Sequence, residues 1–266
     1  MDVQARHNIN IVGTNDGPTI LLVHGFGCDQ NLWRHVVEEL RSEFRLILID
    51  LVGSGSSDPH AWDISKYSSL AGYAADILEI VEQLDLRDLV YVGHSVSAMT
   101  GALATIENPS RFAKLVLLTP SPCYIDDSGY RGGFSEADID ELLESLEQNY
   151  LGWSQAMAPV IMGTPERPEL GDELAATFCR TDPECARVFA RTTFLSDNRA
   201  DLPRVSIPTL VIECAQDAIA PREVGAYVHQ HISGSHKITL DATGHCPHVS
   251  APAETAAAIA AFARST

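Results

Sequence analysis

The segment Gly93-His94-Ser95-Val96-Ser97 ends an apolar run and begins a helical pattern, and it places a serine at the junction. A sharp turn from strand to helix would hold the Ser95 hydroxyl above a sheet, provided that the residues two positions before and after it are small. Gly93 meets this condition, and Ser97 stands where the usual G-x-S-x-G motif has its second glycine. The pattern predicts a nucleophile elbow, and a purely structural turn is the alternative.

A serine hydroxyl is a poor nucleophile near neutral pH, so it needs a histidine as base and a carboxylate that orients the histidine. Asp217 comes three residues after the apolar run LVIEC, and His245 comes shortly after the run KITL. The resulting chain order is serine, acid, histidine, which is one of the known triad orders. We therefore expect Ser95, Asp217 and His245 to act as a catalytic triad that attacks a carbonyl carbon.

Each of the two partners of the serine has a rival. Asp217 could instead cap a helix that starts near Pro221, and Asp241 is a second candidate for the acid. His248 is a second candidate for the base. The spacing of His245 and His248 resembles a metal-binding pair, but no further ligand cluster stands beside it, so we expect no metal and no other cofactor.

Acyl transfer places negative charge on a carbonyl oxygen, and this charge must be met by donors that are already in place. The glycine-containing segment VHGFGCD follows an apolar run, and Val96 directly follows the expected nucleophile. We expect the backbone N–H groups of Phe26 and Val96 to form an oxyanion hole.

A substrate pocket is expected next to these groups, lined by Phe26, Trp153, Met157, Phe194 and Ile219. The alternative for the aromatic residues between positions 150 and 195, which also include Phe178 and Phe189, is that they form a local core.

Six short apolar runs are predicted to be buried strands: residues 19–25, 45–51, 88–94, 113–120, 208–214 and 236–242. Amphipathic patterns between them predict helices, including helices over residues 70–84 and 95–108. This alternation implies crossover connections and a mostly parallel sheet with helices on both faces. Because each expected triad residue follows a strand, all three are expected at the same edge of the sheet.

The alternation stops between residues 121 and 202, where the patterns are helical. The segment SEADIDELLESLEQNY begins with Ser135 and has Asp138 three residues later, a capping-box pattern followed by one apolar face and acidic residues elsewhere. We predict a core formed by residues 1–120 and 203–266, with residues 121–202 inserted as a helical cap over the carboxyl ends of the strands.

The chain of 266 residues has 18 Lys and Arg against 36 Asp and Glu, a net charge of −18, and residues 121–199 hold 15 acidic against 6 basic residues. Such a charge opposes binding to nucleic acid or to an anionic membrane, and we expect neither as a partner.

Six cysteines are scattered without a C-x-x-C pair, which favours reduced thiols over a disulfide framework. No apolar run approaches the roughly 18 residues of a membrane-spanning helix, so we expect a cytoplasmic protein.

Several long segments resemble one branch of the α/β-hydrolase superfamily, nearly from end to end: HGFGCDQNLW, DLVGSGSSD, YVGHSVSAMTG, TPSPCYIDD and GHCPHVSAP. The branch comprises the RsbQ-type bacterial stress-response regulators and the related karrikin and strigolactone receptors of plants. The segments SPCYIDD and GHCPH favour the bacterial proteins, whereas GHSVSAM, with Ser97 in place of glycine, favours the plant receptors.

The resemblance implies an α/β-hydrolase fold with a four-helix cap that encloses an apolar pocket over the triad. It implies a slow serine hydrolase that acts on a small apolar ester or lactone, such as a butenolide. It equally implies an alternative, in which the protein senses a small ligand and activates a phosphatase-type partner in a stress response, with slow or vestigial hydrolysis.

Overall fold

The computed structural model describes residues 2–265 and contains a seven-stranded sheet. Its strands are β1 (Asn10–Gly13), β2 (Thr19–Val23), β3 (Arg45–Ile49), β4 (Leu89–His94), β5 (Phe112–Leu118), β6 (Thr209–Gln216) and β7 (His236–Thr243). Across the sheet they follow the order β1-β3-β2-β4-β5-β6-β7. Strands β2 to β7 pair in parallel, and β1 pairs with β3 in the antiparallel direction.

Each of the six predicted apolar runs forms a strand, and the edge strand β1 lies outside them. All four residues of β1 are exposed, so the strand has no buried face and its sequence carries no periodic pattern that would reveal it. Pairing with β3 alone holds it at the edge of the sheet.

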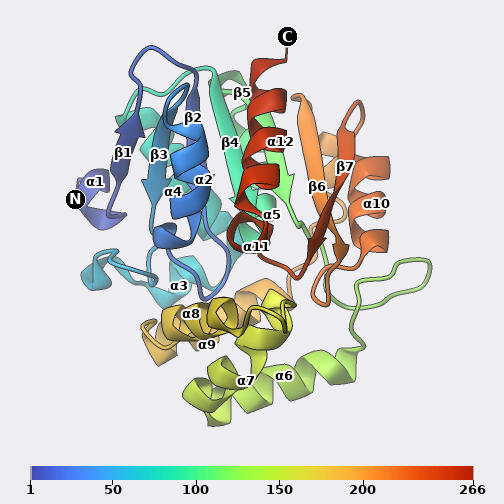
Figure 1. The fold of residues 1–266 in the computed structure, drawn as a ribbon. Helices are drawn as coiled ribbons and strands as arrows, with labels where there is room; N and C mark the ends of the chain where they lie inside the picture. Colours follow the sequence, from blue (N-terminus) through green and yellow to red (C-terminus); the bar gives the residue numbers. More distant parts are fainter. Residues whose placement is uncertain (1, 266) are drawn as a thin grey trace.

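The helices surround the sheet on both faces (Figure 1). They are α1 (Val3–Arg6), α2 (Arg34–Leu40), α3 (Ile64–Tyr67), α4 (Leu70–Gln83), α5 (Val96–Glu107), α6 (Glu136–Gln148), α7 (Tyr150–Met162), α8 (Pro168–Phe178), α9 (Pro183–Phe194), α10 (Arg222–His231), α11 (Pro247–Ser250) and α12 (Pro252–Arg264). Four short 3₁₀ turns complete the described elements: η1 (Gln30–Trp33), η2 (Pro59–Ala61), η3 (Pro109–Arg111) and η4 (Leu202–Arg204).

Two apolar clusters form the core, one on each face of the sheet. Successive residues of a strand point to opposite faces, so β2 contributes Leu21 and Val23 to one cluster and Ile20 and Leu22 to the other. The first cluster lies against α4 and α5, and the second lies against α2 and α12. Both faces of the sheet are therefore covered over the central strands β2 to β6, which is typical of a parallel sheet.

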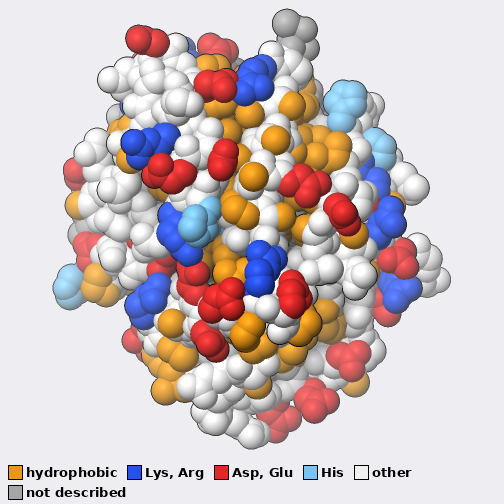
Figure 2. Space-filling model, viewed as in Figure 1, with side chains coloured by type: hydrophobic (Ala, Val, Ile, Leu, Met, Phe, Trp, Pro, Cys, Tyr) orange, Lys and Arg blue, Asp and Glu red, His pale blue; other side chains and the backbone are white. Residues whose placement is uncertain are grey.

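Helices α6 to α9 lie beyond the carboxyl ends of the parallel strands (Figure 1). All four fall within the predicted cap, residues 121–202. Helix α6 begins with the expected capping box: the Ser135 hydroxyl accepts from the N–H of Asp138, and the Asp138 carboxylate accepts from the N–H of Ser135. Its six acidic side chains are exposed, and Figure 2 shows acidic groups gathered at the lower edge of the molecule, where this helix lies.

Candidate functional site

Ser95 lies between the end of β4 and the start of α5, and its backbone has φ 57° and ψ −124°. This conformation is costly for a residue with a side chain, so the surroundings must impose it. A Cβ atom on Gly93 would come within 2.3 Å of the carbonyl oxygen of Ser97, which leaves room only for glycine. The N–H of Ser95 also donates to the carbonyl oxygen of Leu118, 2.9 Å away. The turn is a strand-to-helix elbow, as the sequence predicts.

Ser97 occupies the position of the second glycine in the usual motif, and its side chain is fully buried. Its hydroxyl donates to the carbonyl oxygen of His24 at 2.5 Å, and its own carbonyl accepts from the Tyr91 hydroxyl at 2.9 Å. A serine is therefore accommodated here because its hydroxyl has a partner in His24, directly after β2.

Three of the predicted residues meet at the carboxyl edge of the sheet. The imidazole Nε2 of His245 lies 2.7 Å from the Ser95 hydroxyl oxygen, and its Nδ1 lies 2.7 Å from a carboxylate oxygen of Asp217. The other oxygen of this carboxylate accepts from the N–H groups of Ile219 and Ala220. Because a carboxylate only accepts, Nδ1 carries the proton and leaves Nε2 free to accept from the serine.

The loops that carry the acid and the histidine are tied to each other. Asp217 directly follows β6 and His245 follows β7 by two residues, and the N–H of Gly244 donates to the carbonyl oxygen of Gln216 at 2.8 Å. The side chains of Asp217 and His245 are only 1% and 5% exposed. Burial strengthens the hydrogen bonds between them because little water competes.

The rival residues lie elsewhere. Asp241 is exposed. Asp217 binds N–H groups that precede α10 and does not cap that helix. His248 is fully buried between the rings of Trp33 and His94, with centroid distances of 4.5 and 4.4 Å. Burial lowers the pKa of His248 well below its usual value, and neither ring nitrogen has a hydrogen-bond partner in the described structure.

The N–H groups of Phe26 and Val96 have no acceptor among the described residues. Val96 begins α5, so its N–H belongs to the unpaired first turn of that helix. The ring of Phe26 is surrounded by four aromatic rings of the cap at centroid distances of 5.6 to 6.1 Å, those of Trp153, Phe178, Phe189 and Phe194. The loop that carries one free N–H is therefore packed directly against the cap.

A small cavity of about 30 Å³ lies at the serine. Its lining comprises Phe26, Cys28, His94, Ser95, Tyr124, Ile161, Leu174, Phe178, Thr193, Phe194, Ile219, His245 and Cys246. Of the five predicted pocket residues, Trp153 and Met157 do not line it. Trp153 packs one layer behind, against Phe26 and Phe178, because its ring fills the space between α7 and α8.

Tyr124 is a lining residue that the sequence patterns do not single out. Its hydroxyl lies 3.5 Å from the Ser95 hydroxyl oxygen, and the side chain is fully buried. It follows β5 by six residues, in an irregular segment where no periodicity indicates which side chain turns inward. Its place within TPSPCYIDD, one of the segments that carry the family resemblance, is the signal that could have identified it.

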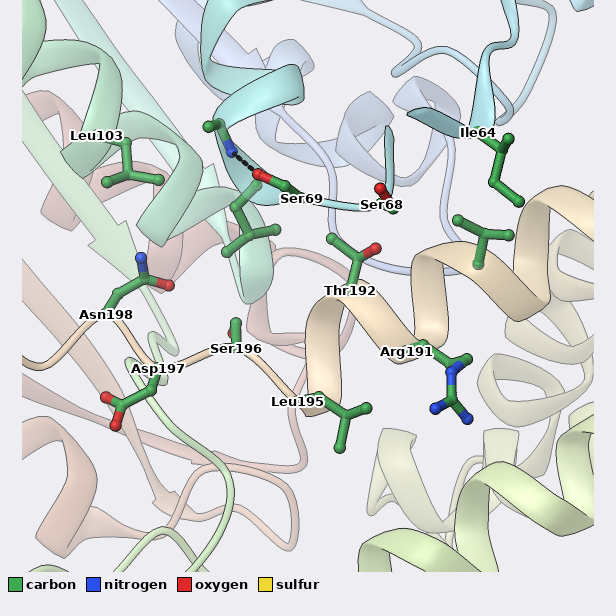
Figure 3. A pocket seen from close by; sticks show the side chains of 13 residues that line it. Ile64, Ser68, Ser69, Leu103, Arg191, Thr192, Leu195, Ser196, Asp197 and Asn198 are labelled. Carbon is green, nitrogen blue, oxygen red and sulfur yellow. Dashed lines mark hydrogen bonds between the residues drawn. The ribbon is translucent and has the colours of Figure 1, made fainter. Parts of the chain in front are cut away.

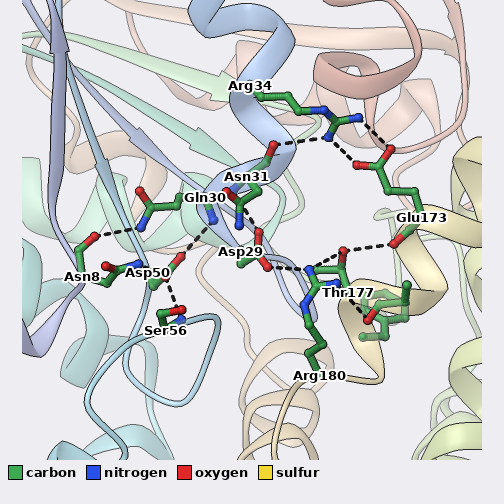
Figure 4. Close-up of polar contacts among 12 residues, drawn as sticks. Asn8, Asp29, Gln30, Asn31, Arg34, Asp50, Ser56, Glu173, Thr177 and Arg180 are labelled. Carbon is green, nitrogen blue, oxygen red and sulfur yellow. Dashed lines mark hydrogen bonds and ion pairs between the residues drawn. The ribbon is translucent and has the colours of Figure 1, made fainter.

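Two ion pairs connect the cap to the core, one at the loop of Phe26 and one at helix α2 (Figure 4). Arg180, just after α8, donates to the buried carboxylate of Asp29 at 2.8 Å. Arg34 on α2 binds the carboxylate of Glu173 on α8 with both terminal nitrogens. Although burial raises the pKa of Asp29, the hydrogen bond from Arg180 holds this pKa below its usual value.

A wider groove of about 640 Å³ lies on the surface, and Ser95, Asp217 and His245 do not line it. Figure 3 shows it between the start of α4, where Ser69 caps the helix, and the end of α9. Leu195 and Ile64 are exposed in this groove, at 46% and 56%.

Within residues 2–265, no group of three or more His, Cys, Asp or Glu side chains is arranged to hold a metal ion. None of the helices in this range has the length and apolarity that crossing a bilayer requires.

Known proteins resemble this chain over most of its length. A family model described as the alpha/beta hydrolase family matches residues 20–258. A probable esterase of Oryza sativa subsp. japonica is 39% identical over 251 residues, which is 94% of this chain and 93% of that protein. A karrikin insensitive 2 receptor of Petunia hybrida is 37% identical, with the same coverage of 94% and 93%. The solved structure of a hydrolase from Oleispira antarctica has a TM-score of 0.97 at 40% identity and covers 100% of this chain and 97% of its own.

Replacing His248 with phenylalanine should stabilise the protein, most strongly in acid. The substitution His248→Phe removes two buried nitrogens without partners, which we expect to raise the free energy of unfolding at pH 7 by about 1–2 kcal/mol. As the pH falls below about 6.5, the unfolded wild type takes up a proton that the folded form resists, so the wild type loses stability and the gap widens.

Urea unfolding at pH 7.5, 6.5 and 5.5 measures this difference, with the exposed residue His60 as the matched position for a His60→Phe control. The prediction would be contradicted if the difference in the free energy of unfolding between wild type and His248→Phe were the same at all three pH values.

Proposed function

Because this chain belongs to the alpha/beta hydrolase family, we propose that it is a serine hydrolase that cleaves small apolar carboxylic esters or lactones, including butenolide-like compounds. The observation that carries the proposal is the continuous hydrogen-bonded line from Asp217 through His245 to the Ser95 hydroxyl, with 2.7 Å at each step. A strained elbow, a buried acid and a base with one free nitrogen together have no purely structural explanation.

The acylation step follows from these contacts. Nε2 of His245 accepts the proton of Ser95 while the serine oxygen attacks the carbonyl carbon of the substrate. The imidazolium that forms lies against the carboxylate of Asp217, which stabilises its charge. His245 then gives the proton to the leaving alkoxide, and the acyl group stays on Ser95. Water attacks the acyl group in the same way during deacylation, with His245 again as the base.

The N–H groups of Phe26 and Val96 are the donors for the oxyanion. Both are unpaired in the described structure, so they lose no existing hydrogen bond when they bind the developing charge. The Val96 donor also lies at the first turn of a twelve-residue helix, whose dipole favours a negative charge at this end.

The lining of the cavity defines the class of substrate. Most of it is apolar, and its polar groups besides the triad include the hydroxyls of Tyr124 and Thr193. The Thr193 hydroxyl is buried and has no hydrogen-bond partner in the described structure, so it can orient an ester or lactone oxygen. A volume of about 30 Å³ holds little more than a water molecule, so entry of a substrate requires side chains of the cap to move.

A second candidate function is ligand sensing, and helix α9 is the observation that favours it. This helix contributes Thr193 and Phe194 to the cavity at the serine. Arg191 of the same helix, and Leu195 directly after it, line the surface groove of Figure 3. A ligand that displaces α9 would change the shape of the groove. A phosphatase-type partner in a stress response, expected from the resemblance, belongs to this candidate.

Substitutions at the triad test the proposed hydrolysis. Ser95→Ala should lower kcat for p-nitrophenyl acetate by at least ~10³-fold, and Asp217→Asn by roughly 10²–10⁴-fold, because the nucleophile or the oriented base is lost. Asp241→Asn is the matched control, since this exposed acid also follows an apolar run, and it should retain the wild-type rate. Ser95→Ala turnover equal to that of the wild type would eliminate the mechanism.

Enlarging the cavity should change the preference for the acyl chain. Phe194→Ala should raise the ratio of kcat/KM for hexanoate over acetate esters at least ~10-fold, because one methylene in an apolar pocket is worth about 1–3 kcal/mol. Phe189→Ala on the same helix is the control: this buried ring does not line the cavity, so stability falls while the ratio stays unchanged. Equal changes in both variants would show that the effect is not local, and Phe194→Leu gives a milder variant.

Hydrogen–deuterium exchange tests the sensing candidate without a partner. When a butenolide binds Ser95→Ala protein, we expect amide exchange over residues 188–198 to change, since these residues span the cavity and the groove. Residues 222–231 of α10 form no part of either site and serve as the internal control. Saturating butenolide that leaves exchange over residues 188–198 unchanged would count against ligand sensing through α9.

A further inference from the structure

Thr193, on the last turn of α9, lines the cavity at Ser95. The residue is 1% exposed, and its hydroxyl oxygen has no hydrogen-bond partner among residues 2–265. Proton transfer in the proposed mechanism runs between Ser95 and His245 and does not involve this hydroxyl. A buried hydroxyl normally has a partner in the protein, so its lack at this position needs an explanation.

The other helical threonines show what is unusual about Thr193. A threonine within a helix can donate its hydroxyl to a carbonyl oxygen of the preceding turn. Each of the other threonines in the described helices donates to a carbonyl oxygen: Thr100, Thr105, Thr177, Thr192 and Thr255. Thr192 lies directly before Thr193, and its acceptor is the carbonyl oxygen of Tyr67 at 3.0 Å. The missing partner is therefore a property of the position at the cavity and not of helix α9.

The backbone around Thr193 is held firmly beside the serine. The carbonyl oxygen of Thr193 accepts from the N–H and the hydroxyl of Ser196, at 3.3 and 2.8 Å. The ring of Phe194, the next residue, packs against the rings of Tyr124 and Phe26 at centroid distances of 5.1 and 5.9 Å. This turn of α9 thus lies against the groups that surround the serine, and a molecule bound there meets Thr193.

The reacting part of an ester already has its partners in the proposed mechanism. The N–H groups of Phe26 and Val96 meet the carbonyl oxygen, and His245 gives its proton to the alkoxide. A substrate that fills the cavity excludes water, so an alkyl group beside Thr193 leaves the hydroxyl unpaired. An oxygen atom at the same place accepts from the hydroxyl and removes this penalty. Thr193 therefore favours a substrate that has an oxygen atom beyond the reacting ester group.

We propose that Thr193 is a specificity-determining residue, and that the substrate of this site is a small ester or lactone with a further ether, hydroxyl or carbonyl oxygen, which accepts a hydrogen bond from the Thr193 hydroxyl. The expected effect on turnover rests on the proposed hydrolase function, whereas the hydrogen bond requires binding alone. A site that binds a substrate oxygen discriminates against the analogue without it, because the polar group of the site is then left unpaired.

Matched pairs of esters test the proposal, with an ether oxygen in one member at the place of a methylene in the other. On the acyl side, the p-nitrophenyl esters of methoxyacetic, β-methoxypropionic and γ-methoxybutyric acid are compared with those of butyric, pentanoic and hexanoic acid. On the alcohol side, methoxyethyl acetate is compared with butyl acetate. The measured quantity is the ratio of kcat/KM for the ether ester over that for the alkyl ester.

Thr193→Val keeps the shape of the side chain and removes the hydroxyl. We expect this variant to lower the ratio by roughly 10–100-fold for at least one pair, because the ether oxygen loses its donor. Dividing the wild-type ratio by that of the variant cancels the intrinsic reactivity of each ester. The urea midpoint of Thr193→Val should equal or exceed that of the wild type, since no hydrogen bond within the protein is lost.

Two further variants separate recognition from a structural effect. Thr193→Ser retains the hydroxyl and should retain the wild-type ratio. Thr192→Val is the matched control on the same helix: it loses the hydrogen bond to Tyr67, so its urea midpoint should fall while the ratio stays unchanged.

Three outcomes would overturn the proposal: ratios unaltered in Thr193→Val for every pair on both sides of the carbonyl, equal changes in Thr192→Val and Thr193→Val, or loss of the preference in Thr193→Ser. If the wild type hydrolyses none of these esters, the hydrolase function fails, and calorimetric binding of the ether esters then decides recognition. Binding at least ~10-fold weaker in Thr193→Val than in the wild type would support the hydrogen bond, and equal binding or none would refute it.

Discussion

The site depends on the close approach of helix α5 to the end of strand β4. The carbonyl oxygen of Ser97 lies so close to Gly93 that a Cβ atom there would clash with it. The chain between these two residues therefore turns sharply, and Ser95 takes φ 57°. Such a backbone costs of the order of 1–3 kcal/mol, and the sheet bond to Leu118 and the Ser97 bond to His24 compensate for it. The strain holds the hydroxyl above the sheet edge, where β6 and β7 deliver its partners.

Burial of this edge has two opposing consequences. It strengthens the hydrogen bonds of Asp217 and His245, yet the cap that provides it leaves a cavity too small for an ester. The cap is joined to the core by aromatic packing on Phe26 and by the pairs of Arg180 with Asp29 and Arg34 with Glu173. Arg34 and Glu173 are both partly exposed, and such a pair contributes at most about 1 kcal/mol. The carboxylate of Asp29 is buried, so opening of the cap at Arg180 would leave a buried charge without its partner.

The sequence predicts the parts of the molecule that local patterns determine. Apolar runs identify the six parallel strands because all except the edge strand β7 are largely buried on both faces, and the Ser135 capping box identifies the start of α6. The sequence favours Asp217 as the acid but keeps Asp241 as a rival, and it is the structure that places Asp217 against His245 and Asp241 at the surface. Packing between distant segments decides the rest: it places Tyr124 in the cavity and Trp153 behind it. No local pattern carries that information.

The backbone of His245 is held in place by buried hydrogen bonds. Its carbonyl oxygen accepts from Nε2 of His94 at 2.8 Å and from the Thr119 hydroxyl at 3.1 Å, so two buried donors fix the loop that presents its imidazole to Ser95. The ring of His94 also packs against the buried ring of His248, at a centroid distance of 4.4 Å. His94 ends β4 and Thr119 directly follows β5, so the donors that hold the loop of the base come from the same sheet edge that carries the serine.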